Sequence, residues 1–135
     1  MEFPKLCEEH RLKALTPPSG KVSMVLDTDT YNEIDDQFAV VYSLLSSESV
    51  DVEAIYAAPF HNYRSSGPGD GMERSYEEIL RLLDRLGVES DGFVFRGSDS
   101  YLPGPEEAVN SEAVEDLIVK ARADRDGPLY LLPIG

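Results

Sequence analysis

Four short apolar runs, separated by stretches with helical spacing, most constrain what this chain can fold into. The runs cover residues 21–26, 52–58, 93–95 and 129–134. The first of them is β-branched and apolar without a period of two, which is typical of a strand that is buried on both faces. Strands that alternate with helices predict an α/β fold with a mostly parallel sheet and helices on both faces, and this architecture is Rossmann-like.

The helix expected after the first run has the clearest apolar face. Ile34, Phe38, Val41, Tyr42 and Leu45 recur at the spacing of an amphipathic helix. Asn32 precedes this pattern, and its side chain is of the type that commonly caps a helix N-terminus. We therefore predict a helix that begins just after Asn32.

A long connection is predicted over residues 59–71, with the glycine-rich run Gly67-Pro68-Gly69-Asp70-Gly71 inside it. A helix should follow, because Tyr76, Ile79, Leu82, Leu83 and Leu86 share a face and Gly87 is a natural stop. Ser75 and Glu78 have the spacing of a capping box at its start. A further helix is marked by Val114, Leu117, Ile118 and Ala121.

The chain divides at Pro17-Pro18-Ser19-Gly20 into an N-terminal extension, residues 1–20, and one α/β domain, residues 21–135. A short helix is expected over residues 4–15. The formal net charge of −14 disfavours nucleic acid and anionic membranes as partners. The single cysteine, Cys7, fits a reducing compartment, and we predict a cytoplasmic location.

The acidic segment, residues 27–36, is the best sequence clue to function. It holds five carboxylates in ten residues and directly follows the first predicted strand. Acids are favoured in the first turn of a helix by about 0.3–1 kcal/mol each, which is enough to explain Asp35 and Asp36. Asp27 and Asp29 at the strand end need another explanation, because crowded carboxylates are costly without a cation. Oxygen ligands alone favour Ca²⁺ or Mg²⁺ over Zn²⁺.

Several acidic motifs compete for this segment. An EF-hand loop starting at Asp27 would need Gly and Glu where the chain has Asn32 and Phe38, so that motif is excluded. A Mg²⁺-dependent aspartyl phosphatase of the haloacid dehalogenase type, with Asp27 as nucleophile, remains an alternative, although Tyr31 departs from its pattern. A non-catalytic binding or assembly module is the other alternative.

The segment resembles the N-terminal signature of the nucleoside hydrolase family, whose members include inosine–uridine-preferring enzymes. That signature is an apolar strand, Asp-x-Asp, a turn, and Asp-Asp before an apolar helix. The chain reads Val25-Leu26-Asp27-Thr28-Asp29 and then Asp35-Asp36-Gln37-Phe38-Ala39. The turn between the pairs, residues 30–34, resembles a longer variant of the family's Pro-Gly turn. The resemblance extends over nearly all of residues 21–135.

The resemblance implies hydrolysis of the N-glycosidic bond of a ribonucleoside to free base and ribose. Asp29 and Asp36 would bind Ca²⁺, with Mg²⁺ as the other possible ion, and Asp29 would also deprotonate the attacking water. Asp35 and Asn62 would bind the ribose. Asp27 would not bind the ion itself but would hold the neighbouring metal ligands in position.

Family members are considerably longer, and the resemblance covers only their N-terminal part. Further metal ligands and the residues that recognise and protonate the base would follow Gly135. We therefore expect this chain alone to be weakly active or inactive. A homo-oligomer is one assembly that the sequence leaves open. The preferred nucleobase cannot be read from these residues.

Overall fold

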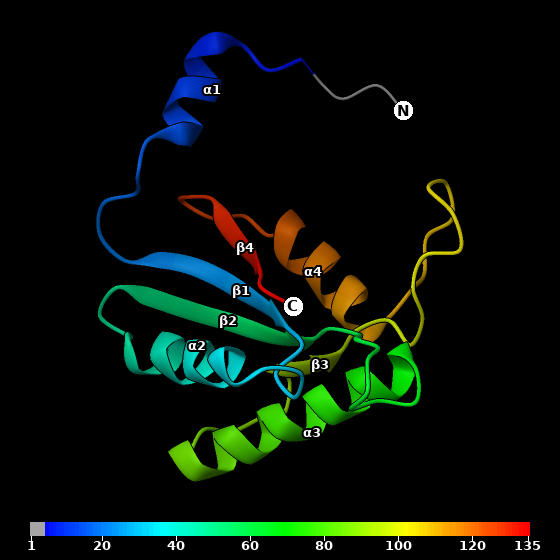
Figure 1. Cartoon of the computed structure of the whole chain (residues 1–135). Coiled ribbons are helices and arrows are strands. Elements are labelled where there is room, and N and C mark those ends of the chain that lie inside the picture. Colours follow the sequence, from blue (N-terminus) through cyan, green and yellow to red (C-terminus); the bar gives the residue numbers. More distant parts are fainter. Residues whose placement is uncertain (1–4) are drawn as a thin grey trace.

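The computed structural model describes residues 5–135 and has a four-stranded, entirely parallel sheet in the order β3-β2-β1-β4 (Figure 1). This arrangement confirms the predicted α/β, Rossmann-like fold class. The strands are β1 (Val22–Thr28), β2 (Val50–Ala57), β3 (Val94–Arg96) and β4 (Leu129–Pro133).

Helices cover both faces of the sheet, as predicted. Figure 1 shows α2 (Ile34–Leu45) and α3 (Pro68–Leu86) below the sheet and α4 (Glu112–Arg122) above it. The predicted N-terminal helix is α1 (Glu8–Leu15), which buries none of its residues. Residue 4 of the predicted range lies outside the described residues. None of the helices from residue 5 onward is long and apolar enough to cross a membrane.

The core has one apolar layer on each side of the sheet. Alternate β1 residues point to opposite faces, so Met24 and Leu26 pack toward α2 and α3, while Val25 packs toward α4. The layer on the α2 and α3 side is the larger and also contains Val40, Ile55, Ile79, Leu82, Leu83 and Val94. The smaller layer contains Ala54, Tyr56 and Ala113.

The strand order places a topological switch point between β1 and β4. The chain leaves β1 toward one face of the sheet through α2, and it reaches β4 from the other face through α4. In open parallel sheets, ligands bind outside the carboxyl ends of the strands at such a point. The acidic segment begins at the end of β1, so the fold puts it at the favoured position for a ligand.

The predicted loop over residues 59–71 is wrong at its end, because α3 already begins at Pro68. A proline is well suited to the first turn of a helix, where its missing N–H is not needed. Gly71 is required for packing rather than for a turn, since a Cβ there would lie 2.0 Å from the Phe60 carbonyl oxygen. The predicted capping box is also wrong: Ser75 lies inside α3 and is fully buried. The predicted stop at Gly87 is confirmed by its left-handed backbone, with φ of 68°.

The apolar face predicted for α2 is only partly used by the core. Of the five predicted residues, Val41 alone packs partly against the core, and the buried apolar residue of α2 is Val40, which was not among them. The other four predicted residues form an apolar stripe that is 68–75% exposed: Ile34, Phe38, Tyr42 and Leu45. The physical reason is that α2 packs against β2 and α3, and these four side chains lie on the parts of its surface that face solvent.

Strand β4 is an edge strand, because within residues 5–135 it pairs with β1 alone. Leu131, Leu132 and Ile134 are exposed there. The main chain of Ile134 still follows the end of β1, since its N–H donates to the Asp27 carbonyl oxygen at 2.8 Å.

Candidate functional site

The candidate site is built at the carboxyl end of β1, where Thr28, Asp29 and Thr30 are buried in succession. Asp29 is only 7% exposed, and its Oδ2 accepts a hydrogen bond from Asn32 Nδ2 at 2.9 Å. A tight turn supports this contact, because the Asn32 N–H also donates to the Asp29 carbonyl oxygen at 2.6 Å. Both the side chain and the main chain of Asn32 therefore contact Asp29, three residues earlier in the chain.

Asp36, which follows the turn, is held by a hydrogen bond from Thr28, which precedes it. It lies in the first turn of α2, is 7% exposed, and accepts a hydrogen bond from the Thr28 hydroxyl at 2.6 Å. Thr28 has only one hydroxyl hydrogen, so in its 3.0 Å contact with Thr30 the Thr30 hydroxyl is the donor. The hydrogen bonds thus run from Thr30 to Thr28 and from Thr28 to Asp36, and they hold Asp36 close to the end of β1.

The pKa values of Asp29 and Asp36 are both raised, as expected for buried carboxylates without compensating positive charge. Burial raises the pKa of Asp29 to about 6, the Asn32 hydrogen bond opposes this shift, and the nearby charge of Asp36 adds to it. Burial also raises the pKa of Asp36, and the charges of Asp35 and Glu33 raise it further. Neither Asp29 nor Asp36 has a salt bridge within residues 5–135. The pair is therefore electrostatically unfavourable in the absence of a cation.

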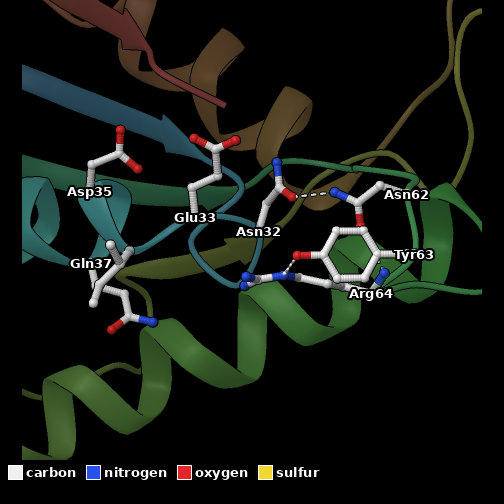
Figure 2. Close-up of a pocket in the computed structure, with 8 residues that line it drawn as sticks. Asn32, Glu33, Asp35, Gln37, Asn62, Tyr63 and Arg64 are labelled. Carbon is white, nitrogen blue, oxygen red and sulfur yellow. Dashed lines mark hydrogen bonds between the residues drawn. The ribbon is translucent and has the colours of Figure 1, made fainter.

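An open pocket of about 660 Å³ is lined by Asn32 and Asp35, whereas Asp29 and Asp36 are not among its walls (Figure 2). Its walls come from the start of α2 and from the loop that follows β2: Asn32, Glu33, Ile34, Asp35, Gln37, Asn62, Tyr63 and Arg64. Figure 2 shows Asn32 and Asn62 facing each other, joined by a hydrogen bond from Asn62 Nδ2 to Asn32 Oδ1 at 2.5 Å. The two residues predicted to bind ribose, Asp35 and Asn62, thus line one pocket.

Asp27 lies apart from the other predicted site residues. It belongs to the α4 side of the sheet and lines a separate cavity of about 190 Å³ with Tyr56, Ser98 and Ser111 among its walls. Burial raises the pKa of Asp27, and its charge contributes to the raised pKa of Tyr56. Asp27 is linked to the site by the main chain alone, because Asp29 follows it by two residues at the end of β1.

The donor set fits part of the coordination shell of a hard cation. Asp29 and Asp36 supply buried carboxylate oxygens, and the residues around them offer hydroxyl and amide oxygens. Over the part of the chain that the structure describes, no group of three or more His, Cys, Asp or Glu side chains is arranged to hold a metal ion. A cation held by Asp29 and Asp36 would therefore have to take its remaining ligands from other oxygen donors.

Asn32 is the site residue whose role the sequence did not reveal. It was predicted as the N-cap of α2, and this prediction is wrong, because the cap residue is Glu33 and makes no side-chain capping bond. The side chain of Asn32 instead contacts Asp29 and Asn62. Asparagine side chains readily bond to nearby groups in turns as well as in caps, so residue type alone could not separate the two roles.

Fold and site together define an α/β protein with an acidic site at the switch point of a parallel sheet. Comparison of the chain with protein-family models, with curated proteins and with solved structures found no match.

Proposed function

We propose that this chain carries cation-binding and ribose-binding residues of a hydrolase that cleaves the N-glycosidic bond of ribonucleosides. The observation that carries the proposal is the pairing of two buried, uncompensated carboxylates, Asp29 and Asp36, together with an open pocket lined by Asp35 and Asn62. The resemblance of residues 25–29 and 35–39 to the nucleoside hydrolase signature supplies the reaction class.

The cation follows from the electrostatics of the pair. Burial raises the pKa of both carboxylates, and the charge of Asp36 raises that of Asp29 further; a divalent ion between them would stabilise their ionised forms. All the acidic donors are oxygens, which favours Ca²⁺ or Mg²⁺. When bound, such an ion supplies positive charge that makes a neighbouring water easier to deprotonate.

The roles of the side chains in this proposal come from the resemblance to the nucleoside hydrolase signature. Asp29, held by Asn32, is oriented to take the proton from the attacking water. Asp35 and Asn62 present an acceptor and an amide to ribose hydroxyls from two walls of the pocket. As the bond to the base breaks, positive charge develops on the sugar, and the carboxylates of the acidic segment stabilise it. Asp27 supports the end of β1 that positions Asp29.

The phosphatase alternative has less support. Its nucleophile would be Asp27, which lines the 190 Å³ cavity on the α4 side and not the open pocket. Acceptance of phosphate by Asp27 would therefore require a substrate to enter a different and smaller space.

The proposal is tested by calorimetric titration of the protein with Ca²⁺ and, separately, with Mg²⁺. We expect saturable binding that is lost in Asp36→Asn, because this substitution removes one of the two acidic ligands. Release of ribose from a panel of nucleosides should be slow and should depend on the same ion. Absence of binding of either ion by the unmodified protein would refute the proposal.

Asp84→Asn provides the matched control. Asp84 is an exposed acid near the C-terminus of α3, and the substitution removes the same charge far from the acidic segment in sequence. Its ion affinity should equal that of the unmodified protein. An equal loss in both variants would mean that the protein attracts cations only through its net charge.

A further inference from the structure

We infer that Asn32 is a positioning residue that couples the cation-binding side of the site to the ribose-binding side. The inference rests on the proposed function and deepens it. Asn32 lies between the two predicted groups: its amide nitrogen donates to Asp29, and its amide oxygen accepts from Asn62. We call the series Asn62–Asn32–Asp29 the asparagine bridge.

The direction of every hydrogen bond in the bridge is fixed from its outer end. The main-chain N–H of Arg64 can only donate, and it donates to Asn62 Oδ1 at 2.9 Å. This contact leaves Asn62 Nδ2 to face Asn32, so the atom it meets must be the acceptor Asn32 Oδ1. Asn32 Nδ2 then points to Asp29, whose ionised carboxylate can only accept.

Both amide orientations are therefore determined by the Arg64 N–H, which cannot reverse its role, and they match the ionised form of Asp29. Rotating either amide by half a turn would place two donors or two acceptors against each other. An aspartate or a leucine at position 32 could not replace the residue, because the bridge needs one donor and one acceptor on the same short side chain.

The bridge also joins two separate loops at the carboxyl ends of neighbouring strands. Asn32 follows β1, and Asn62 follows β2. The second loop is itself ordered, since the Asn62 N–H donates to Ser65 Oγ at 3.4 Å and the Ser65 hydroxyl donates to the Phe60 carbonyl oxygen at 3.0 Å. A shift of Asn62 on contact with ribose would therefore reach Asp29 through two hydrogen bonds.

The test is a double-mutant cycle read by calorimetric Ca²⁺ affinity in the full chain, with Asn32→Ala, Asn62→Ala and the double variant. Removing a group that orients a metal ligand typically costs about 10–100-fold in metal affinity, and we expect a loss in this range for Asn32→Ala. Asn62→Ala should cause a smaller loss. In the double variant the loss should equal that of Asn32→Ala alone, because Asn62 acts on Asp29 only through Asn32.

Asn110→Ala is the matched control, since Asn110 Nδ2 also donates to a carboxylate, Glu115 Oε1 at 2.7 Å, but Asn110 belongs neither to the bridge nor to the open pocket. Its Ca²⁺ affinity should be unchanged. Thermal unfolding of each variant separates loss of folding from loss of binding, and a residue that only stabilised the turn would change the unfolding temperature without changing the Ca²⁺ affinity.

The outcomes separate the two proposals. If the unmodified protein binds Ca²⁺ and Asn32→Ala binds it equally well, the bridge is refuted while the proposed function stands. Strictly additive losses in the double variant would also refute the bridge. If the unmodified protein binds neither Ca²⁺ nor Mg²⁺, the proposed function fails and the inference fails with it.

Discussion

Helices α2 and α3 cover the same face of the sheet, yet they use their apolar residues in opposite ways. In α3, Ile79, Leu82 and Leu83 are buried in the core. In α2, the apolar stripe is exposed, and the buried residues are Val40 and the charged Asp36. The comparison teaches that apolar spacing identifies a face of a helix but does not identify what, if anything, covers it. It also shows that α2 is anchored in part by a polar contact, Thr28 to Asp36.

The largest expected effect tests the buried side of the comparison. Leu83 is fully buried in α3, so Leu83→Ala removes packed atoms and leaves a cavity. We expect a loss of about 2–5 kcal/mol in the free energy of unfolding. Urea denaturation followed by circular dichroism measures it. A loss well under 1 kcal/mol would mean that α3 is not packed as described.

The next effect tests the polar anchor of α2. Thr28→Val keeps the shape of the side chain but leaves Asp36 without its donor and Thr30 without its acceptor. We expect a loss of about 1–3 kcal/mol in unfolding free energy, the usual cost of leaving buried polar groups unsatisfied. Thr16→Val is the matched control, because the Thr16 hydroxyl donates to the Leu12 carbonyl oxygen on an exposed part of α1. Equal losses in the two variants would contradict the anchor.

A smaller effect is the dependence of stability on pH, which arises from Asp29 between β1 and α2. Asp29 has a folded-state pKa of about 6, above its ordinary value of roughly 3.9 in an unfolded chain. The folded protein therefore binds this proton more tightly, and the resulting stability is fully present below the unfolded pKa and is lost as pH rises through about 6. Without divalent ions, the unfolding temperature should rise when pH is lowered from 7 to 5.

The raised pKa of Asp36 acts in the same direction, whereas Glu53 and Asp70 have lowered pKa values and lose their stabilisation only at more acidic pH. Calorimetry of Asp29→Asn should show a flatter dependence on pH between 5 and 7. A protein that is less stable at pH 5 than at pH 7, with no change in Asp29→Asn, would contradict the assigned electrostatics.

The smallest expected effect tests the exposed side of the comparison. Phe38 belongs to the apolar stripe and is 68% exposed, so Phe38→Ala should change the unfolding free energy by less than about 0.5 kcal/mol. Urea denaturation at two protein concentrations measures it. A loss of 2 kcal/mol or more, growing with concentration, would show that the stripe is covered in solution by another copy of the chain.

The fold was largely predictable from the sequence because its strands are short apolar runs and its helices have clear spacing. Two local features were not predictable. Residues 67–71 look like a loop in composition, but Gly71 is needed for close approach to Phe60, a contact between segments that no local pattern encodes. The exposure of Phe38 and Tyr42 depends on which elements flank α2, which spacing alone cannot say.

The candidate site divides in the same way. The pairing of Asp29 with Asp36 could be predicted, because both lie within a few residues on a strand end and the following helix start. The placement of Asn62 opposite Asn32 depends on two loops from neighbouring strands meeting in space, and Asn32 itself was predicted as a cap. Residue types define the chemistry of this site, whereas the connections between its residues are set by the tertiary structure.

The proline at the end of β4 has a consequence for self-association. The Ile134 N–H points to β1, and successive residues of a strand alternate, so position 133 faces outward from the sheet. Pro133 has no N–H to offer there, and the outer rim of β4 therefore lacks one of the donors that an incoming strand would need. A strand added at this edge would therefore form one hydrogen bond fewer, next to the exposed side chains of Leu131 and Leu132.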